Sequence, residues 1–161
     1  MDIDRKAPVV VRAQVRVASD AETVWRTLTD LDAWPRWKSS VQQMRFAGSL
    51  IPGASFTWKA GRLTIASTLQ EVEPPVTIGW TGSTTGIAAD DVYRLRVVDG
   101  GTEVTQEESW SGLLPRIARP LLRRTLKSTL ERDLQSLRTE AERRAAAGSP
   151  AASAPAEAAL G

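Results

Sequence analysis

The feature that most limits the fold of this chain is a long apolar stripe between Leu113 and about Ala146. Its members recur three, four or seven residues apart, which places them on one face of a helix. A helix of about 30 residues is roughly 45 Å long, so the stripe needs a broad and concave apolar partner. The stripe comprises Leu114, Ile117, Ala118, Leu121, Leu122, Leu126, Leu130, Leu134 and Leu137.

The residues before this helix predict a curved antiparallel β-meander. Val9–Val17 alternates apolar and polar side chains, which is typical of a half-buried strand. The same alternation returns between Val41 and Trp110, in segments separated by glycine and proline turns. We expect a loose loop at residues 82–86 and a hairpin turn at residues 99–101. A flat sheet could not cover so long a helix, so the sheet must twist and curve.

Two short helices are expected between the first and second strands, over residues 19–37. Ser19 and Glu22 have the spacing of a capping box, which predicts that Ser19 caps the first of these helices. Near the C-terminus, Pro120 would clash with the preceding turn of a straight helix, which predicts a break near Arg119. We expect one domain over residues 1–147 and a disordered tail rich in Ala, Pro and Ser over residues 148–161.

The composition excludes several classes of chemistry. The chain has no cysteine and no histidine, which rules out disulfides, thiolate chemistry, histidine-dependent triads and most zinc sites. It also lacks the Gly-x-Gly-x-x-Gly and P-loop motifs, so we expect no metal and no cofactor. Residues 1–8 do not resemble a signal peptide, and no apolar run is long enough to span a bilayer. We therefore expect a soluble cytoplasmic protein, as a monomer or homodimer.

The distribution of charge leaves two interpretations of the last helix. The net charge of +2 is too small to indicate a nucleic-acid partner. However, the segment from Arg116 to Lys127 contains five bases and no acid. Such a helix could lie on an anionic membrane, or its bases could be the solvated face of a packed helix. We favour the second interpretation, because the apolar stripe can be fully used inside the domain.

Four groups of residues occur in a familiar order and spacing. They are Val24-Trp25 with Leu28-Thr29-Asp30, Trp34-Pro35-Arg36-Trp37, Glu71–Pro75 before Ile78-Gly79-Trp80, and Gly101–Thr105 leading to Glu107–Gly112. Together they resemble the START-like, or SRPBCC, superfamily, and within it the polyketide cyclase/dehydrase and lipid-transport branch. The resemblance covers about residues 8–146 and implies an α+β helix-grip fold, in which a curved sheet of about seven strands wraps around the C-terminal helix and leaves an apolar cavity. Members bind lipids, hormones or aromatic polyketides, and only some are enzymes, so the resemblance leaves the function open.

A carboxylate cluster on the last hairpin is the candidate for catalysis. A regular turn at Gly100-Gly101 would pair Val97 with Val104, Leu95 with Gln106, Tyr93 with Glu108 and Asp91 with Trp110. The apolar members predict that this set faces inward. Asp91 and Glu108 would then be diagonal neighbours about 7 Å apart.

This arrangement suits acid–base chemistry. Mutual repulsion and lost solvation would raise the proton affinity of at least one carboxylate. Asp91 or Glu108 could act as a base that forms an enolate, with Tyr93 as the hydrogen-bond donor to its oxygen. Alternatively, Asp91 lies in water at the open end of the strand, and Glu108 bonds to Tyr93 or to a backbone amide.

Aromatic side chains on the inward positions predict a ligand pocket, with ordinary core packing as the alternative. Our leading hypothesis is a module that binds a hydrophobic or aromatic small molecule, either lipid-like or polyketide-like. The alternatives are a cyclase, aromatase or dehydratase that uses the carboxylate–tyrosine cluster, and a peripheral lipid-transfer protein that uses the basic helix. The candidate ligand-binding residues are Phe56, Trp58, Ile65, Ser67, Trp80, Gln106, Trp110 and Leu122.

Overall fold

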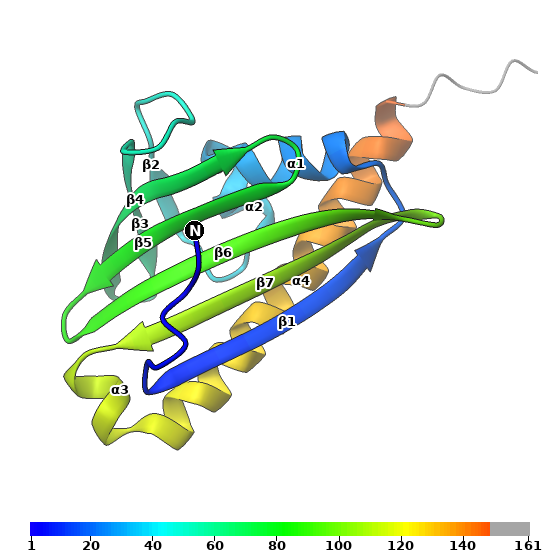
Figure 1. Ribbon diagram of the computed structural model, residues 1–161. Helices are drawn as coiled ribbons and strands as arrows, with labels where there is room; N and C mark the ends of the chain where they lie inside the picture. The colour runs from blue at the N-terminus through cyan, green and yellow to red at the C-terminus, as the bar shows by residue number, and fades with distance from the viewer. Residues whose placement is uncertain (149–161) are drawn as a thin grey trace, which may run out of the picture.

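The computed structural model describes residues 1–148, which form one curved antiparallel sheet and a long helix (Figure 1). The sheet has seven strands in the order β1-β7-β6-β5-β4-β3-β2, so only β1 pairs out of sequence order. This arrangement confirms the predicted α+β helix-grip architecture. The strands are β1 (Val9–Val17), β2 (Gln43–Arg45), β3 (Ser55–Ala60), β4 (Leu63–Glu73), β5 (Thr77–Thr84), β6 (Ile87–Val98) and β7 (Gly101–Ser111).

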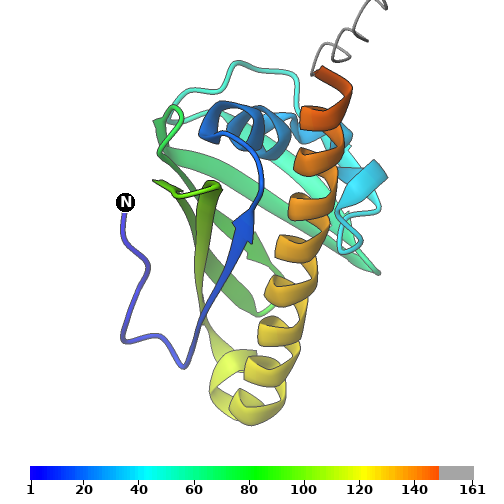
Figure 2. The same cartoon turned by 90° about the vertical axis from the view of Figure 1, so that its right-hand side faces the viewer.

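The helices lie on one face of the sheet, which we call the inner face. The C-terminal helix α4 (Arg119–Gly148) runs along it, as Figure 2 shows. A short helix α3 (Leu113–Ile117) precedes α4, and the predicted break between them falls at Ala118. Between β1 and β2 lie α1 (Ala21–Thr29), the 3₁₀ turn η1 (Leu31–Ala33) and α2 (Trp34–Trp37). Of the residues that the structure describes, none belongs to a helix long and apolar enough to cross a membrane.

The core lies between the inner face and the second half of α4. Leu126, Leu130, Leu134 and Leu137 are each 1% exposed, which confirms the helical period for this half of the stripe. The alternating valines of β1 are buried on the same side, while Arg12 and Arg16 are exposed. Burial of each leucine side chain contributes about 2 kcal/mol to stability by removing apolar surface from water.

The first part of the stripe is not buried, and this corrects the expectation that the domain uses all of it. Leu114, Ile117 and Leu121 are 45%, 73% and 66% exposed. The break at Ala118 gives the physical reason, because α3 does not continue the line of α4 along the sheet (Figure 2).

Three local predictions were wrong. Asp20, not Ser19, caps α1, because its carboxylate accepts from the Thr23 amide at 2.8 Å. The expected loose loop at residues 82–86 is a tight turn, since β5 continues to Thr84 and β6 begins at Ile87. Val97 was expected to face inward, but it is 74% exposed, since it lies near the hairpin end beyond the core. Gly148 ends α4, and the rest of the predicted tail lies outside the described residues.

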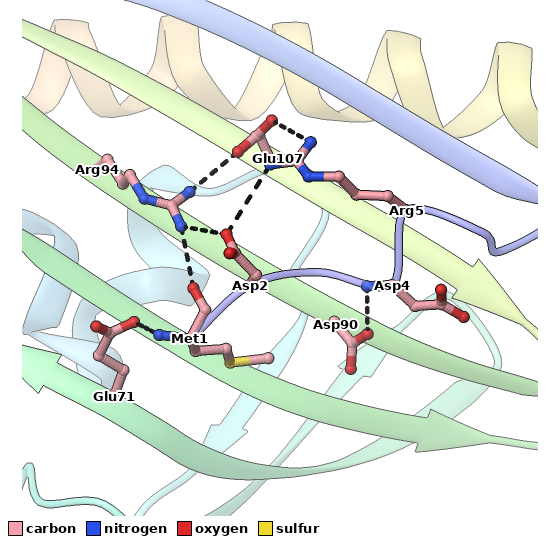
Figure 3. A network of polar contacts seen from close by, with 8 residues as sticks. All are labelled: Met1, Asp2, Asp4, Arg5, Glu71, Asp90, Arg94 and Glu107. Atoms are coloured by element: carbon pink, nitrogen blue, oxygen red, sulfur yellow. Dashed lines mark hydrogen bonds and ion pairs between the residues drawn. The ribbon is translucent and has the colours of Figure 1, made fainter.

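The first residues of the chain cross the outer face of the sheet, opposite α4 (Figure 3). The Met1 amine pairs with Glu71, and the Arg94 guanidinium donates to Asp2 and Glu107 at 3.0 Å each. Further along, Arg5 donates to Glu107 at 3.3 Å. These contacts join β4, β6 and β7 from outside, so the inner face is left for the site.

Candidate functional site

A cavity of about 380 Å³ lies between the inner face of the sheet and α4. Its lining comes from β3 to β7, from the segment after α2 and from α4. Exposed lining residues lie on the β3–β4 hairpin (Gly61 and Leu63), after α2 (Ser39 and Gln42) and on α4 (Thr125 and Arg132), so the cavity opens between these three segments. The buried part of the lining comprises Lys38, Ser67, Trp80, Asp91, Gln106, Leu126, Leu130 and Asp133.

Three tryptophans form much of the apolar wall. Trp58, Trp80 and Trp110 all line the cavity, as the inward period of their strands predicts. The Trp80 ring packs against two other rings. Its centroid lies 5.5 Å from that of Tyr93, on which it stacks, and 5.6 Å from that of Trp34. The Trp58 indole N–H donates to Ser67 at 3.2 Å. Trp80 is therefore a buried part of the wall, whereas the half-buried rings of Trp58 and Trp110 present more of their surface to the cavity.

Asp91 and Glu108 face each other directly across β6 and β7. Burial raises the pKa of Asp91 to about 7, against the opposing effect of Lys38. Burial also raises the pKa of Glu108 well above its ordinary value, and the neighbouring Asp91 raises it further. Glu108 accepts from the Trp110 indole N–H at 2.5 Å, and both oxygens of Asp91 accept from Gln106 at 3.1 Å. The site thus holds two carboxyl groups with raised pKa values, of which Asp91 is partly ionised near neutral pH.

A buried ion pair completes the polar part of the cavity. Lys38 caps the C-terminus of α2 and is 4% exposed, and its ammonium lies 3.6 Å from the carboxylate of Asp133 on α4. The same ammonium donates to the Tyr93 hydroxyl at 3.2 Å and lies 4.3 Å from the centre of the Trp34 ring. Ser40 donates to Asp133 at 2.6 Å. The pair therefore links α2, α4 and the sheet at the buried part of the cavity.

Two buried acceptors in the lining have no partner among the described residues. They are the amide oxygen Oε1 of Gln106 and the carboxylate oxygen Oδ1 of Asp133. The amide nitrogen of Gln106 donates to Asp91 and so fixes the orientation of the side chain, which leaves Oε1 without a hydrogen-bond donor. A buried acceptor without a donor costs about 1–3 kcal/mol, which a bound hydroxyl or amide group would recover.

The structure places most of the predicted site residues at the cavity. Asp91 and Glu108 line it, and so do six of the eight predicted ligand-binding residues. Phe56 and Leu122 are outside the lining, since Phe56 is a core residue that packs edge-on against Trp34 and Trp80. The six are Trp58, Ile65, Ser67, Trp80, Gln106 and Trp110.

The predicted register of the last hairpin was wrong by two residues. Tyr93 pairs with Gln106 and Asp91 with Glu108, because the two-residue turn is Asp99-Gly100 rather than Gly100-Gly101. A shift of two keeps the same side chains on the inner face. It turns a diagonal carboxylate pair into a directly opposed one. Tyr93 lies behind the wall, where its hydroxyl accepts from Lys38, so it is not placed to donate to a ligand.

Lys38 and Asp133 were not predicted as site residues. Asp133 carried a usable signal, because it is three residues after Leu130 and four before Leu137, within the buried stripe. Lys38 carried none, since it follows a short aromatic segment without periodicity.

The chain matches the family model described as "Polyketide cyclase / dehydrase and lipid transport" over residues 8–142. No curated protein sequence matches it. These findings agree with the resemblance to the START-like superfamily.

Solved structures share the fold at low sequence identity. The ZhuI aromatase/cyclase from Streptomyces sp. R1128 is 20% identical with a TM-score of 0.77, and the match covers 88% of this chain and 98% of that one. A START superfamily protein from Mycobacterium smegmatis is 15% identical with a TM-score of 0.73, over 84% and 98% of the two chains. The di-domain aromatase/cyclase StfQ of the steffimycin pathway is 18% identical with a TM-score of 0.72, over 86% of this chain and 52% of its own.

Proposed function

Because the chain belongs to the polyketide cyclase/dehydrase and lipid-transport family, we propose that its cavity binds a neutral aromatic molecule that carries hydroxyl groups. The observation that carries this proposal is the combination of three tryptophans with two unpartnered buried acceptors in one cavity. The ZhuI and StfQ structures are aromatase/cyclases, which is consistent with a polyketide-like ligand.

The apolar wall favours a flat ligand. The volume of about 380 Å³ falls within the usual range of small-molecule sites, about 300–1,000 Å³. The half-buried Trp58 and Trp110 offer ring surface beside the buried Trp80, and Leu126 and Leu130 of α4 line the cavity from the helix side. Aromatic rings stack on such faces with a gain of about 0.5–1.5 kcal/mol beyond the area that they bury.

The polar groups favour hydrogen-bond donors on that ligand. Gln106 Oε1 and Asp133 Oδ1 are acceptors, so a ligand hydroxyl satisfies either one and a ligand ether or carbonyl does not.

The charges disfavour an anionic ligand. The carboxylate of Asp133 and the ionised fraction of Asp91 line the cavity together with one buried ammonium at Lys38, which Asp133 already pairs. The other lining cation, Arg132, is exposed. A ligand carboxylate would be desolvated beside these acidic groups, which is unfavourable at a short distance and low dielectric.

A matched series of naphthalenes tests this proposal. Isothermal titration calorimetry would compare 2-naphthol, naphthalene and 2-naphthoate, which differ only in the polar group. We expect 2-naphthol to bind about tenfold more tightly than either of the others, corresponding to about 1.4 kcal/mol. In Gln106→Leu, the advantage of 2-naphthol over naphthalene should fall. Tighter binding of 2-naphthoate would overturn the proposed ligand class.

The opposed carboxyl groups favour a second candidate function, enolisation of a bound ketone. The Asp91 carboxylate would take a proton from the carbon next to the carbonyl, and the electron pair would move to the carbonyl oxygen. The protonated carboxyl of Glu108 would donate a hydrogen bond to that oxygen. A base with a pKa near the working pH suits this step, because it is partly ionised and still holds the proton firmly.

Deuterium exchange tests the second candidate without knowledge of the natural substrate. The probe is 2-tetralone, whose acidic protons next to the carbonyl exchange with heavy water and are followed by NMR. We expect exchange faster than in buffer, with a loss of about a hundredfold in Asp91→Asn and a smaller loss in Glu108→Gln. Wild-type exchange at the buffer rate, or unchanged exchange in both variants, would exclude this chemistry.

A further inference from the structure

The exposed part of the C-terminal stripe forms an apolar surface beside the opening of the cavity. We call it the α3 patch, and it consists of Leu113, Leu114, Ile117 and Leu121, which are 66%, 45%, 73% and 66% exposed. Aliphatic residues this exposed and this close together in a chain usually mark an interaction site. Leu113 and Ile117 have no buried role in α3, because Pro115 is the buried residue of that helix.

Five exposed bases lie in the same segment of the chain as the patch. Arg116, Arg119, Arg123, Arg124 and Lys127 are all exposed, and no acidic residue interrupts this run in the sequence. Within the part of the chain that the structure describes, Lys127 alone among the five has an acidic partner within 4 Å, at 3.9 Å from Glu131. The uncompensated charge therefore coincides with the exposed apolar residues.

The position of the patch connects it to the cavity. Leu114 packs over Gly86, so that a Cβ built at Gly86 would lie 3.1 Å from the leucine side chain. Gly86 is flanked by the strand ends at Thr84 and Ile87, which both line the cavity. On the other side, Leu121 is about one helical turn before Thr125, an exposed lining residue. A partner on the patch would therefore lie beside the cavity opening.

We propose that the α3 patch docks on an anionic lipid surface, with its leucines and isoleucine in the interfacial region and its arginines against the lipid headgroups. Apolar side chains surrounded by Arg and Lys are the combination that binds at such an interface. A second copy of this chain fits less well, because a two-fold contact would bring ten bases together without acids from this run. This proposal does not depend on the identity of the cavity ligand.

Vesicle flotation with the full chain tests the proposal. The vesicles would consist of phosphatidylcholine alone or with about one-third phosphatidylglycerol, at about 0.05 M and 0.5 M salt. We expect binding to the anionic vesicles at low salt and a large loss at high salt or without phosphatidylglycerol. The absence of binding to anionic vesicles at low salt would overturn the proposal.

Paired variants distinguish binding by the α3 patch from non-specific binding by any exposed apolar side chain. Leu113→Asn, Ile117→Asn and Leu121→Asn combined should reduce vesicle binding by at least about tenfold, because they remove the apolar contribution. The matched apolar control is Val97→Asn, which is 74% exposed at the β6–β7 hairpin and should bind like wild type.

A charge-reversal pair tests the basic part in the same way. Arg119→Glu with Arg123→Glu should abolish binding, whereas Arg12→Glu with Arg16→Glu on exposed β1 positions should retain most of it. Light scattering should give a monomer. Equal losses in the test and control variants, or a dimer that the triple asparagine variant dissociates, would overturn the membrane assignment.

Discussion

Asp91 on β6 and Glu108 on β7 are direct cross-strand partners, and both carboxyl groups reach the same cavity. Two like charges in this position would destabilise the sheet. The raised pKa of each group reduces the repulsion, because the two carboxyl groups are then not both fully ionised near neutral pH. The protonation of this pair therefore affects both the free energy of unfolding and the acid–base chemistry available in the cavity.

This coupling predicts a pH dependence of stability that removal of Asp91 changes. The folded state raises the pKa of Asp91 from 3.8 to about 7, so folding favours the protonated form. The stabilising contribution is fully present below pH 3.8 and is lost as the pH rises to about 7. Asp91→Asn should gain stability relative to wild type over this window, by at most about 4 kcal/mol.

The measurement is urea unfolding of both proteins at pH 5, 6, 7 and 8, at constant ionic strength. The difference in unfolding free energy should shift in favour of the variant as the pH rises. A difference in unfolding free energy that is constant across this range would contradict the raised pKa of Asp91 in the folded state.

Loss of Lys38 should destabilise the protein strongly. Its ammonium is buried beside Asp133 and also faces Tyr93 and the Trp34 ring. Lys38→Met would leave a buried carboxylate without its counter-ion, which costs about 3–5 kcal/mol. Chemical denaturation measures this cost, with Lys59→Met at an exposed position of β3 as the control. Combining Lys38→Met with Asp133→Asn should recover part of the loss, and equal stability of the two single lysine variants would refute the role of the pair.

The turn between β6 and β7 should tolerate alanine at one glycine and not at the next. A Cβ at Gly101 would lie 2.0 Å from the Val17 carbonyl oxygen, whereas one at Gly100 meets nothing within 4 Å. Both have positive φ, at 150° and 76°. We expect Gly100→Ala to cost about 1 kcal/mol and Gly101→Ala about 3 kcal/mol or more. Thermal unfolding of the two variants checks the order, and similar midpoints would contradict the close approach of β1.

The sequence was sufficient for the fold because each element carries its own period. The alternation in β1 and the leucine spacing in α4 predicted which faces are buried, and Pro120 predicted the break before α4. The alternation of side chains along each strand also placed Trp58, Trp80 and Trp110 on the inner face, because it does not depend on the pairing register.

The parts that could not be predicted depend on contacts between distant segments. The ion pair of Lys38 and Asp133 joins residues that are 95 positions apart, and no local sequence pattern predicts it. The hairpin register depended on which two residues make the turn, and the sequence Asp99-Gly100-Gly101 allows two choices. The exposure of Ile117 could not be read from the stripe either, because this residue has the same period as the buried leucines.

Occupation of the cavity is the central claim, and one pair of variants tests it most directly. Ala89 lines the cavity on β6, whereas Ala88 is exposed on the other face of the same strand. The measurement is the affinity for 2-naphthol by isothermal titration calorimetry in wild type, Ala89→Phe and Ala88→Phe, with folding checked by circular dichroism. We predict that Ala89→Phe loses at least about tenfold in affinity, because its ring occupies the ligand space, while Ala88→Phe binds like wild type. Equal binding by folded Ala89→Phe would contradict a ligand site between the sheet and α4.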